Sequence, residues 1–297
     1  MVLLVDLGQS GTRIRMGKIA ISSTRGKLAG EHPLPALRAV FESIERLTTD
    51  VVALSCTGFG GTVTDPTPFS ALSYELFGAT KTAVIDDGLA GFIGAVGGSH
   101  GVVLSIGGGV VSVGGRDGVF SHRDGLGSTF GDEGGGFWLG KLGITKALGI
   151  RQGRGDDSAF LSALNTQVLA YDALDVKNGA DAATLAISSA RSVLDAADHG
   201  IETAIKIRDE GAFLLAQSVI STWLGAGGSM DEAPEIAIHG GPSGNNSYVQ
   251  AIQAKIVKRI PRAVFVTARG DNLDGAEWIA ENMPDDALPL LRWAHEA

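Results

Sequence analysis

Residues 2–16, VLLVDLGQSGTRIRM, combine two strand patterns around a glycine-rich turn. Residues 2–6 form an apolar run of strand length. Residues 12–19 alternate polar and apolar side chains with period two, as a strand with one solvated face does. The segment therefore predicts a β-hairpin with Gly8–Gly11 at its tip.

A second segment of this kind, VVLSIGGGVVSVG, follows a hundred residues later at 102–114. An apolar run again leads into a glycine turn, Gly107–Gly109, and a returning run. An internal repeat predicts two similar units, with a boundary near Gly97–Gly101. Two unrelated hairpins are the alternative, because 43 of the 297 residues are glycine.

Strand and helix patterns alternate through the rest of the chain, which is typical of a layered, mainly parallel α/β sheet. The predicted strands are 51–56, 81–86, 235–239 and 263–267. The predicted helices are 36–47, 133–148, 158–171, 182–198, 201–224 and 248–259, followed by two more near the C-terminus.

Composition excludes several classes of protein. The 33 acidic and 24 basic residues give a net charge of −9, which disfavours binding to nucleic acid and to anionic membranes. We expect no signal peptide and no membrane span. The single cysteine, Cys56, excludes an intramolecular disulfide and a zinc site of several cysteines, and it fits a cytoplasmic protein.

Three glycine turns follow predicted strands, at 8–11, 107–109 and 240–241. Backbone N–H groups without a neighbouring Cβ can approach an anion closely, phosphate above all. Ser10 and Thr12 add hydroxyl groups to the first turn. One such turn alone is more often structural, but three at strand ends favour a phosphate site.

Carboxylates also stand at these strand ends. Asp6 could hold hydrated Mg²⁺ beside a polyphosphate, or cap the turn. Asp87 follows strand 81–86 and could cap the next helix or face a cleft as a general base. Asp132 lies in GLGSTFGDEGGGFW (125–138), which could bind sugar hydroxyls, although acidic residues are also favoured in a first helical turn.

Five segments, in this order, resemble the acetate-kinase, sugar-kinase, heat-shock-protein and actin superfold: VDLGQSGTR (5–13), VIDDGLAGFIGA (84–95), VVLSIGGG (102–109), GLGSTFGDEGGGFWLG (125–140) and IAIHGG (236–241). Within it, they look like the BadF/BadG/BcrA/BcrD ATPase family, on its N-acetylglucosamine kinase branch. The Gly-Asp-Glu-Gly segment is the most specific of the motifs.

The resemblance implies an α/β fold of two actin-like, ribonuclease H-like domains, with nucleotide and sugar in the cleft between them. The first domain would span 1–98 and be joined by a C-terminal helix, 285–297. The second would span 99–284 and carry a helical insertion.

The resemblance also implies roles for the candidate residues. ATP would be bound by Gly8, Ser10, Gly11, Thr12, Gly107, Gly108, Gly109, Gly240 and Gly241. The acceptor sugar would be bound by Thr57, Gly58, Gly125, Leu126, Gly127 and Asp132. Asp87 would be the catalytic base, and Asp6 would support Mg²⁺.

The implied activity is an ATP-dependent amino-sugar kinase, phosphorylating a hexosamine hydroxyl at C6 and forming a homodimer. Two departures from the family pattern bear on it. Gly108 replaces a hydroxyl residue, so one phosphate hydrogen bond is lost unless Ser105 or Ser112 supplies it. Glu31, in a shortened loop, would favour a free ammonium over an acetamido group, which leaves N-acetylglucosamine and glucosamine both open.

Two other functions fit the same resemblance. A sugar or nucleotide sensor without turnover would explain the altered second phosphate loop. An ATPase that activates an electron-transfer partner would need two cysteines per chain for a shared iron–sulfur cluster, and Cys56 is alone.

Overall fold

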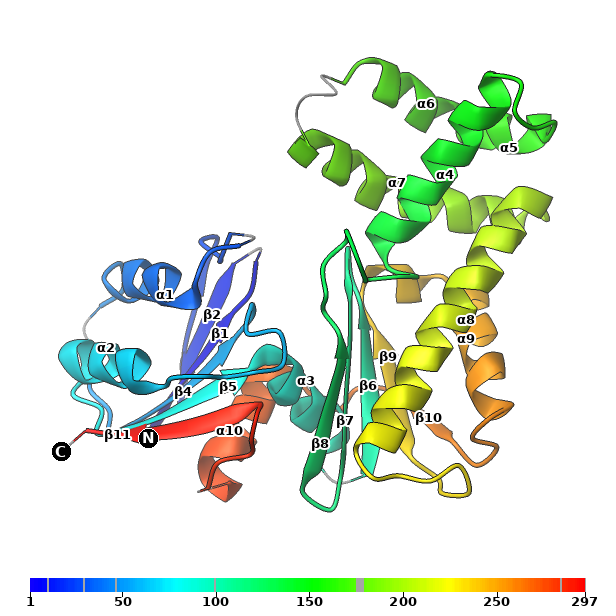
Figure 1. Cartoon of the computed structure of the whole chain (residues 1–297). Coiled ribbons are helices and arrows are strands. Elements are labelled where there is room, and N and C mark those ends of the chain that lie inside the picture. Colours follow the sequence, from blue (N-terminus) through cyan, green and yellow to red (C-terminus); the bar gives the residue numbers. More distant parts are fainter. Residues whose placement is uncertain are drawn as a thin grey trace.

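The computed structural model describes residues 1–9, 11–28, 30–45, 47–98, 100–174, 179–283 and 285–296. Its strands form two separate sheets with helices packed on both faces of each, which confirms the predicted α/β class (Figure 1). Within the described residues, no helix is both long and apolar enough to cross a membrane.

The first sheet has six strands in the order β11-β5-β4-β1-β2-β3. β1, β4 and β5 are parallel, whereas β2, β3 and β11 are antiparallel to their neighbours. The strands are β1 (Val2–Leu7), β2 (Thr12–Met16), β3 (Ile19–Ser23), β4 (Val51–Cys56), β5 (Lys81–Asp86) and β11 (Leu291–His295).

The second sheet has five strands in the order β10-β9-β6-β7-β8. They are β6 (His100–Ile106), β7 (Val110–Arg116), β8 (Val119–Asp124), β9 (Glu235–His239) and β10 (Val264–Val266). An antiparallel meander, β6-β7-β8, is extended by two parallel strands, as β1-β2-β3 is by β4 and β5. The two hairpins recognised in the sequence therefore begin two sheets that share one order of five strands, to which the first sheet adds β11.

Two helices, α3 (Asp87–Val96) and α10 (Asn272–Asn282), lie between the sheets (Figure 1). One apolar core joins both helices to residues of both sheets, including Ile85 and Val113. On the outer face of the first sheet lie α1 (Pro33–Phe41) and α2 (Thr67–Phe77), and on that of the second lie α8 (Glu202–Gly225) and α9 (Asn246–Val257).

A helical lobe extends from one end of the second sheet (Figure 1). Its helices are α4 (Gly136–Arg151), α5 (Ser158–Ala163), α6 (Asn165–Asp172) and α7 (Gly179–Asp198). A short 3-10 helix, η1 (Gly241–Gly244), leads from β9 into α9.

The prediction of a C-terminal helix over 285–297 is wrong, since the described part of that segment contains the strand β11. Pro289 has no N–H to continue a helix, and the residues after it pair with the edge of β5. The segment does join the first sheet, as expected. The predicted domain limits at 98 and 284 stay a prediction, although α10 packs chiefly against α3 and contacts β1 and β4.

Glycines let α3 and α10 pack with their backbones in contact. A Cβ at Gly94 would overlap the carbonyl of Asp271, and one at Gly275 would overlap the carbonyl of Ala90. This close approach fixes the start of α10 near the ends of β1 and β2. Asp271 caps that helix by accepting the N–H groups of Leu273 and Asp274.

Candidate active site

The functional candidates of the first sheet lie where its parallel strands end. The register places Asp6 of β1 beside Ser55 of β4 and aligns the last residues of β4 and β5. Thr57 and Asp87, the residues that follow these two strands, therefore lie close together. The Thr57 side chain interacts with the Asp87 carboxylate and lowers its pKa.

Asp87 is a carboxylic acid suited to exchanging a proton near neutral pH. Burial and the neighbouring charge of Asp86 raise its pKa to about 7, opposed by the interaction with Thr57. Its side chain is only partly covered, at the first residue of α3. A group with a pKa near the working pH is what general acid–base chemistry requires.

Asp86, rather than Asp87, is the N-cap of α3. Its Oδ1 accepts the N–H of Gly88, and its Oδ2 accepts the N–H of Gly61, both at 3.0 Å. Burial raises the pKa of Asp86 as well, against these two hydrogen bonds. Because Asp86 takes the structural role, Asp87 is free to face the site.

We expect catalysis to depend on pH through Asp87. A base must be deprotonated to accept a proton, so with a pKa of about 7 the rate should fall as pH drops through 7 and level off above it. The measurement is the pH profile of kcat/KM. Asp86→Asn removes the neighbouring negative charge that raises the pKa of Asp87. The acidic side of the pH profile should therefore move to lower pH. An unchanged profile would contradict the role of Asp87 as the base.

Asp6 is fully occupied by protein donors. Its Oδ2 accepts Nε and Nη2 of Arg13 at 3.1 and 2.6 Å, and its Oδ1 accepts Ser55 and Asn272 at 3.2 and 3.0 Å. Arg13 also pairs with Asp271. Asp6 and Arg13 face each other across the β1–β2 hairpin, so the sequence spacing could have revealed this pair.

This arrangement does not fit the predicted magnesium role of Asp6. A carboxylate has about four lone-pair positions, and here four donors take them. Arg13 already balances its charge. In the part of the chain that the structure describes, no cluster of three or more His, Cys, Asp or Glu side chains could hold a metal ion.

The predicted first phosphate loop is held in place by backbone contacts of its described residues. The N–H of Gly8 donates to the Gly11 carbonyl at 2.9 Å, and a Cβ at Gly11 would press against the carbonyl of Ser23. The Thr12 hydroxyl is buried and donates to the Arg25 carbonyl at 2.7 Å, so its hydrogen is not available to a phosphate. Ser10 lies outside the described residues.

The predicted second phosphate loop is joined to the helical lobe. The Gly107 and Gly108 carbonyls accept the N–H groups of Gly136 and Phe137, at the start of α4. A Cβ at Gly240 (φ 107°) would overlap the carbonyl of Ile106, so the loop after β9 passes directly over the end of β6. The second and third glycine turns are thereby brought together.

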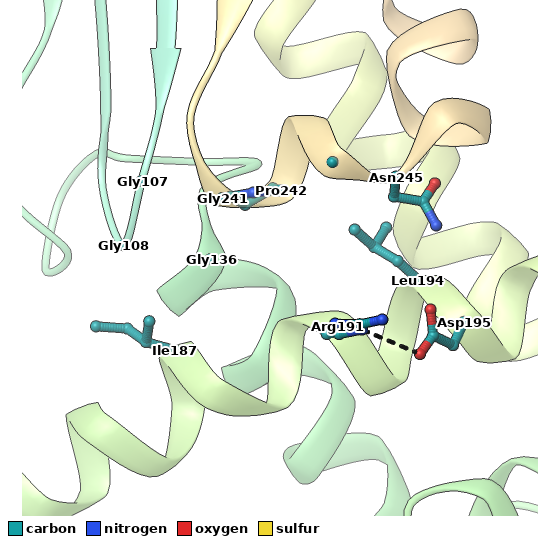
Figure 2. A pocket seen from close by; sticks show the side chains of 11 residues that line it. Gly107, Gly108, Gly136, Ile187, Arg191, Leu194, Asp195, Gly241, Pro242 and Asn245 are labelled. Carbon is teal, nitrogen blue, oxygen red and sulfur yellow. Dashed lines mark ion pairs between the residues drawn. The ribbon is translucent and has the colours of Figure 1, made fainter.

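A cavity of about 460 Å³ opens beside these two turns (Figure 2). Gly107, Gly108 and Gly136 line one side, η1 and Asn245 another, and α7 the third. From α7, Ile187 and Leu194 add apolar surface, and Arg191 lies 3.7 Å from Asp195. The volume falls in the range of small-ligand sites. The sequence prediction did not include the α7 residues.

Neither serine that could replace the missing hydroxyl at Gly108 is free. Ser112 is buried and accepts a hydrogen bond from Thr222 at 2.8 Å. Ser105 lies 2.9 Å from Nε2 of His239, at the ends of β6 and β9.

The predicted sugar loop is exposed at Gly125, Leu126 and Gly127, and it is tied to β7 by the N–H of Gly125, which donates to Val110. The Asp132 side chain instead points toward the end of the Gly107–Gly109 turn. Its Oδ1 accepts the N–H of Val110 at 3.2 Å, and burial raises the pKa of Asp132. Its sugar-binding role stays a prediction.

His122 connects the two sheets near Asp86 and was missed from the sequence. Its Nε2 lies 3.9 Å from Asp86 Oδ1, and its ring lies against Gly61 and Gly125. Burial lowers the pKa of His122, which favours the neutral ring. No sequence signal marks this residue, because two of its neighbours, Gly61 and Asp86, are distant from it along the chain.

Two α/β units of one strand order, with glycine turns and carboxylates at their strand ends, define an actin-like protein. The chain belongs to the BadF/BadG/BcrA/BcrD ATPase family, whose model matches residues 1–277. This confirms the resemblance drawn from the motifs. No protein of curated function matches the sequence.

Solved structures share this fold. A candidate N-acetylglucosamine kinase from Porphyromonas gingivalis is 16% identical, with a TM-score of 0.62 over 95% of this chain and 99% of that one. One from Chromobacterium violaceum is 20% identical, with a TM-score of 0.60 over 93% and 96%. A ROK family glucokinase from Streptomyces griseus, in complex with glucose and AMPPNP, is 15% identical, with a TM-score of 0.56 over 94% and 98%.

Proposed function

We propose that the protein transfers the γ-phosphoryl group of MgATP to a hydroxyl of a hexosamine, at C6. The observation that carries this proposal is Asp87: a partly covered carboxylate with a pKa of about 7, beside Thr57, at the edge of the sheet that bears the first phosphate loop. The structural neighbours described as sugar kinases support the same class of reaction.

Asp87 would act on the acceptor hydroxyl. Its carboxylate accepts the proton as the hydroxyl oxygen bonds to the γ-phosphorus and the bond to the ADP oxygen breaks. Thr57, by interacting with the carboxylate, holds it in position. Most of the acceleration in phosphoryl transfer comes from positioning and from charge stabilisation, so the backbone loops matter as much as the base.

The cavity beside the second and third glycine turns would hold the nucleotide. Ile187 and Leu194 offer apolar contact to the adenine ring, and the glycine turns allow the phosphates to approach the backbone. The acceptor sugar would lie between Thr57–Gly58 and the loop at Gly125–Gly127, with Asp132 at its rim. A homodimer is proposed from family likeness alone.

The test is ADP release from MgATP in a coupled assay, comparing N-acetylglucosamine, glucosamine, N-acetylmannosamine, glucose and no sugar. We expect one amino sugar to stimulate release strongly over the sugar-free rate. Release that no sugar changes would contradict the proposal and indicate an ATPase with a different acceptor. Intact ATP binding without turnover would favour the sensor, whose specific support is the missing hydroxyl at Gly108.

A further inference from the structure

Lys27, in the loop after β3, is a buried cation whose ammonium has one hydrogen-bond partner among the residues that the structure describes. Only 4% of its surface is exposed, which is rare for lysine. Its Nζ donates to the carbonyl of Leu28 at 3.2 Å, and no carboxylate of the described ranges lies within ion-pair distance. An ammonium has three N–H donors, and burying it without a counter-charge is unfavourable.

Contacts on both sides place Lys27 between Gly8 and Gly58, the second of which the proposed function assigns to the acceptor sugar. Its backbone N–H donates to the Gly8 carbonyl of the first phosphate loop at 2.9 Å. Its side chain crosses Gly58, where an added Cβ would lie 2.6 Å from Nζ. Gly58 directly follows Thr57, the partner of Asp87. The Lys27 ammonium therefore lies against the residue that directly follows Thr57 in the chain.

Glu31 does not present its charge to this position, contrary to what the shortened loop suggests. Its Oε2 accepts the N–H of Leu28 at 3.0 Å, and its own N–H donates to the Leu28 carbonyl at 3.1 Å. Glu31 thus closes its own loop and helps to fix the carbonyl that accepts from Lys27. The charge that lies against Gly58 is positive.

We propose that Lys27 determines acceptor specificity, by donating a hydrogen bond to the carbonyl oxygen of an N-acyl group and repelling the free ammonium of an unacylated amino sugar. This inference rests on the proposed sugar-kinase function. It chooses N-acetylated hexosamines over free hexosamines, a choice that the sequence left open. A hydrogen bond from a charged donor discriminates by roughly 10- to 100-fold in kcat/KM.

The experiment compares kcat/KM for N-acetylglucosamine, glucosamine and glucose in the wild type, Lys27→Met and Lys27→Arg. Methionine keeps the length of the stem without the charge. We expect the wild type to prefer N-acetylglucosamine, and Lys27→Met to lose roughly 10- to 100-fold for it through a higher sugar KM. Glucosamine should lose nothing or gain, the KM for ATP should not change, and Lys27→Arg should keep the preference.

Lys18, exposed in the turn between β2 and β3, supplies the matched control, because Lys18→Met makes the same substitution at an exposed position outside the proposed acceptor site. Equal losses for all three sugars, or a wild-type preference for glucosamine, would overturn the role of Lys27 and leave the kinase intact. If Lys27→Met does not fold, the preference for N-acetylglucosamine over glucosamine, measured in the wild type and in Lys27→Arg, still tests the proposal. A wild type that no sugar stimulates overturns the proposed function itself.

Discussion

Replacing Asp87 with asparagine should lower kcat by about 10²–10⁴-fold, the usual contribution of a general base. The amide keeps the shape of the side chain but cannot take the proton of the acceptor hydroxyl. The KM for ATP should change little, since the cavity proposed to hold the nucleotide is lined by other residues. Steady-state kinetics with the best sugar, at a pH above 7, measure both quantities.

The fold should tolerate Asp87→Asn. Burial and the charge of Asp86 both disfavour the ionised Asp87, so removing its charge should leave the melting temperature at pH 8 equal or higher. Asp50→Asn is the matched control, an exposed carboxylate just before β4, at the opposite end of the sheet. A normal rate in Asp87→Asn would refute the base assignment, whereas a loss in both variants would point to a general effect of charge.

The second large effect is expected from Gly241→Leu, which should raise the KM for ATP roughly 100-fold, or ~2.7 kcal/mol in binding. Gly241 lines the cavity proposed to hold the nucleotide, and an added Cβ there meets no protein atom within 4 Å. The leucine side chain would therefore occupy space meant for the nucleotide without straining the fold. Kinetics and direct titration of nucleotide binding would both report the change.

Gly149→Leu provides the comparison, because a Cβ at this α4 position also meets nothing within 4 Å but lies outside the nucleotide cavity. Its KM for ATP should be unchanged. The sugar KM should be similar in both variants. An unaltered KM for ATP in Gly241→Leu would mean that the nucleotide binds elsewhere.

The parts of the fold that the sequence predicts well are long apolar runs between clear breaks. Strands 51–56 and 81–86 agree with β4 and β5 residue for residue, and 201–224 agrees closely with α8. Helix α2 and strands β3 and β8 carry weaker patterns and were missed. The sequence predicts a helix at the final strand because only pairing with β5 makes this segment extended.

For the site, the sequence places groups that follow strand ends but not those that tertiary contacts deliver. Asp87 and the glycine turns could be located because parallel strands end at one edge. Asn272, which hydrogen-bonds to Asp6, comes from 266 positions away along the chain, where no local pattern marks it. Lys27 is likewise identified only by its contact with Gly58.

The pairing of β11 with β5 has a consequence for how the chain folds as it is made. β5 is complete at residue 86, but the strand that covers its edge begins about 200 residues later. At ~5–20 residues per second, the ribosome delivers that strand roughly 10–40 s after β5 has been synthesised. All strands of the second sheet emerge in this interval. The edge of β5 therefore stays unpaired in the nascent chain during that time. An unpaired strand edge is prone to aggregation, and chaperones protect nascent chains in this state.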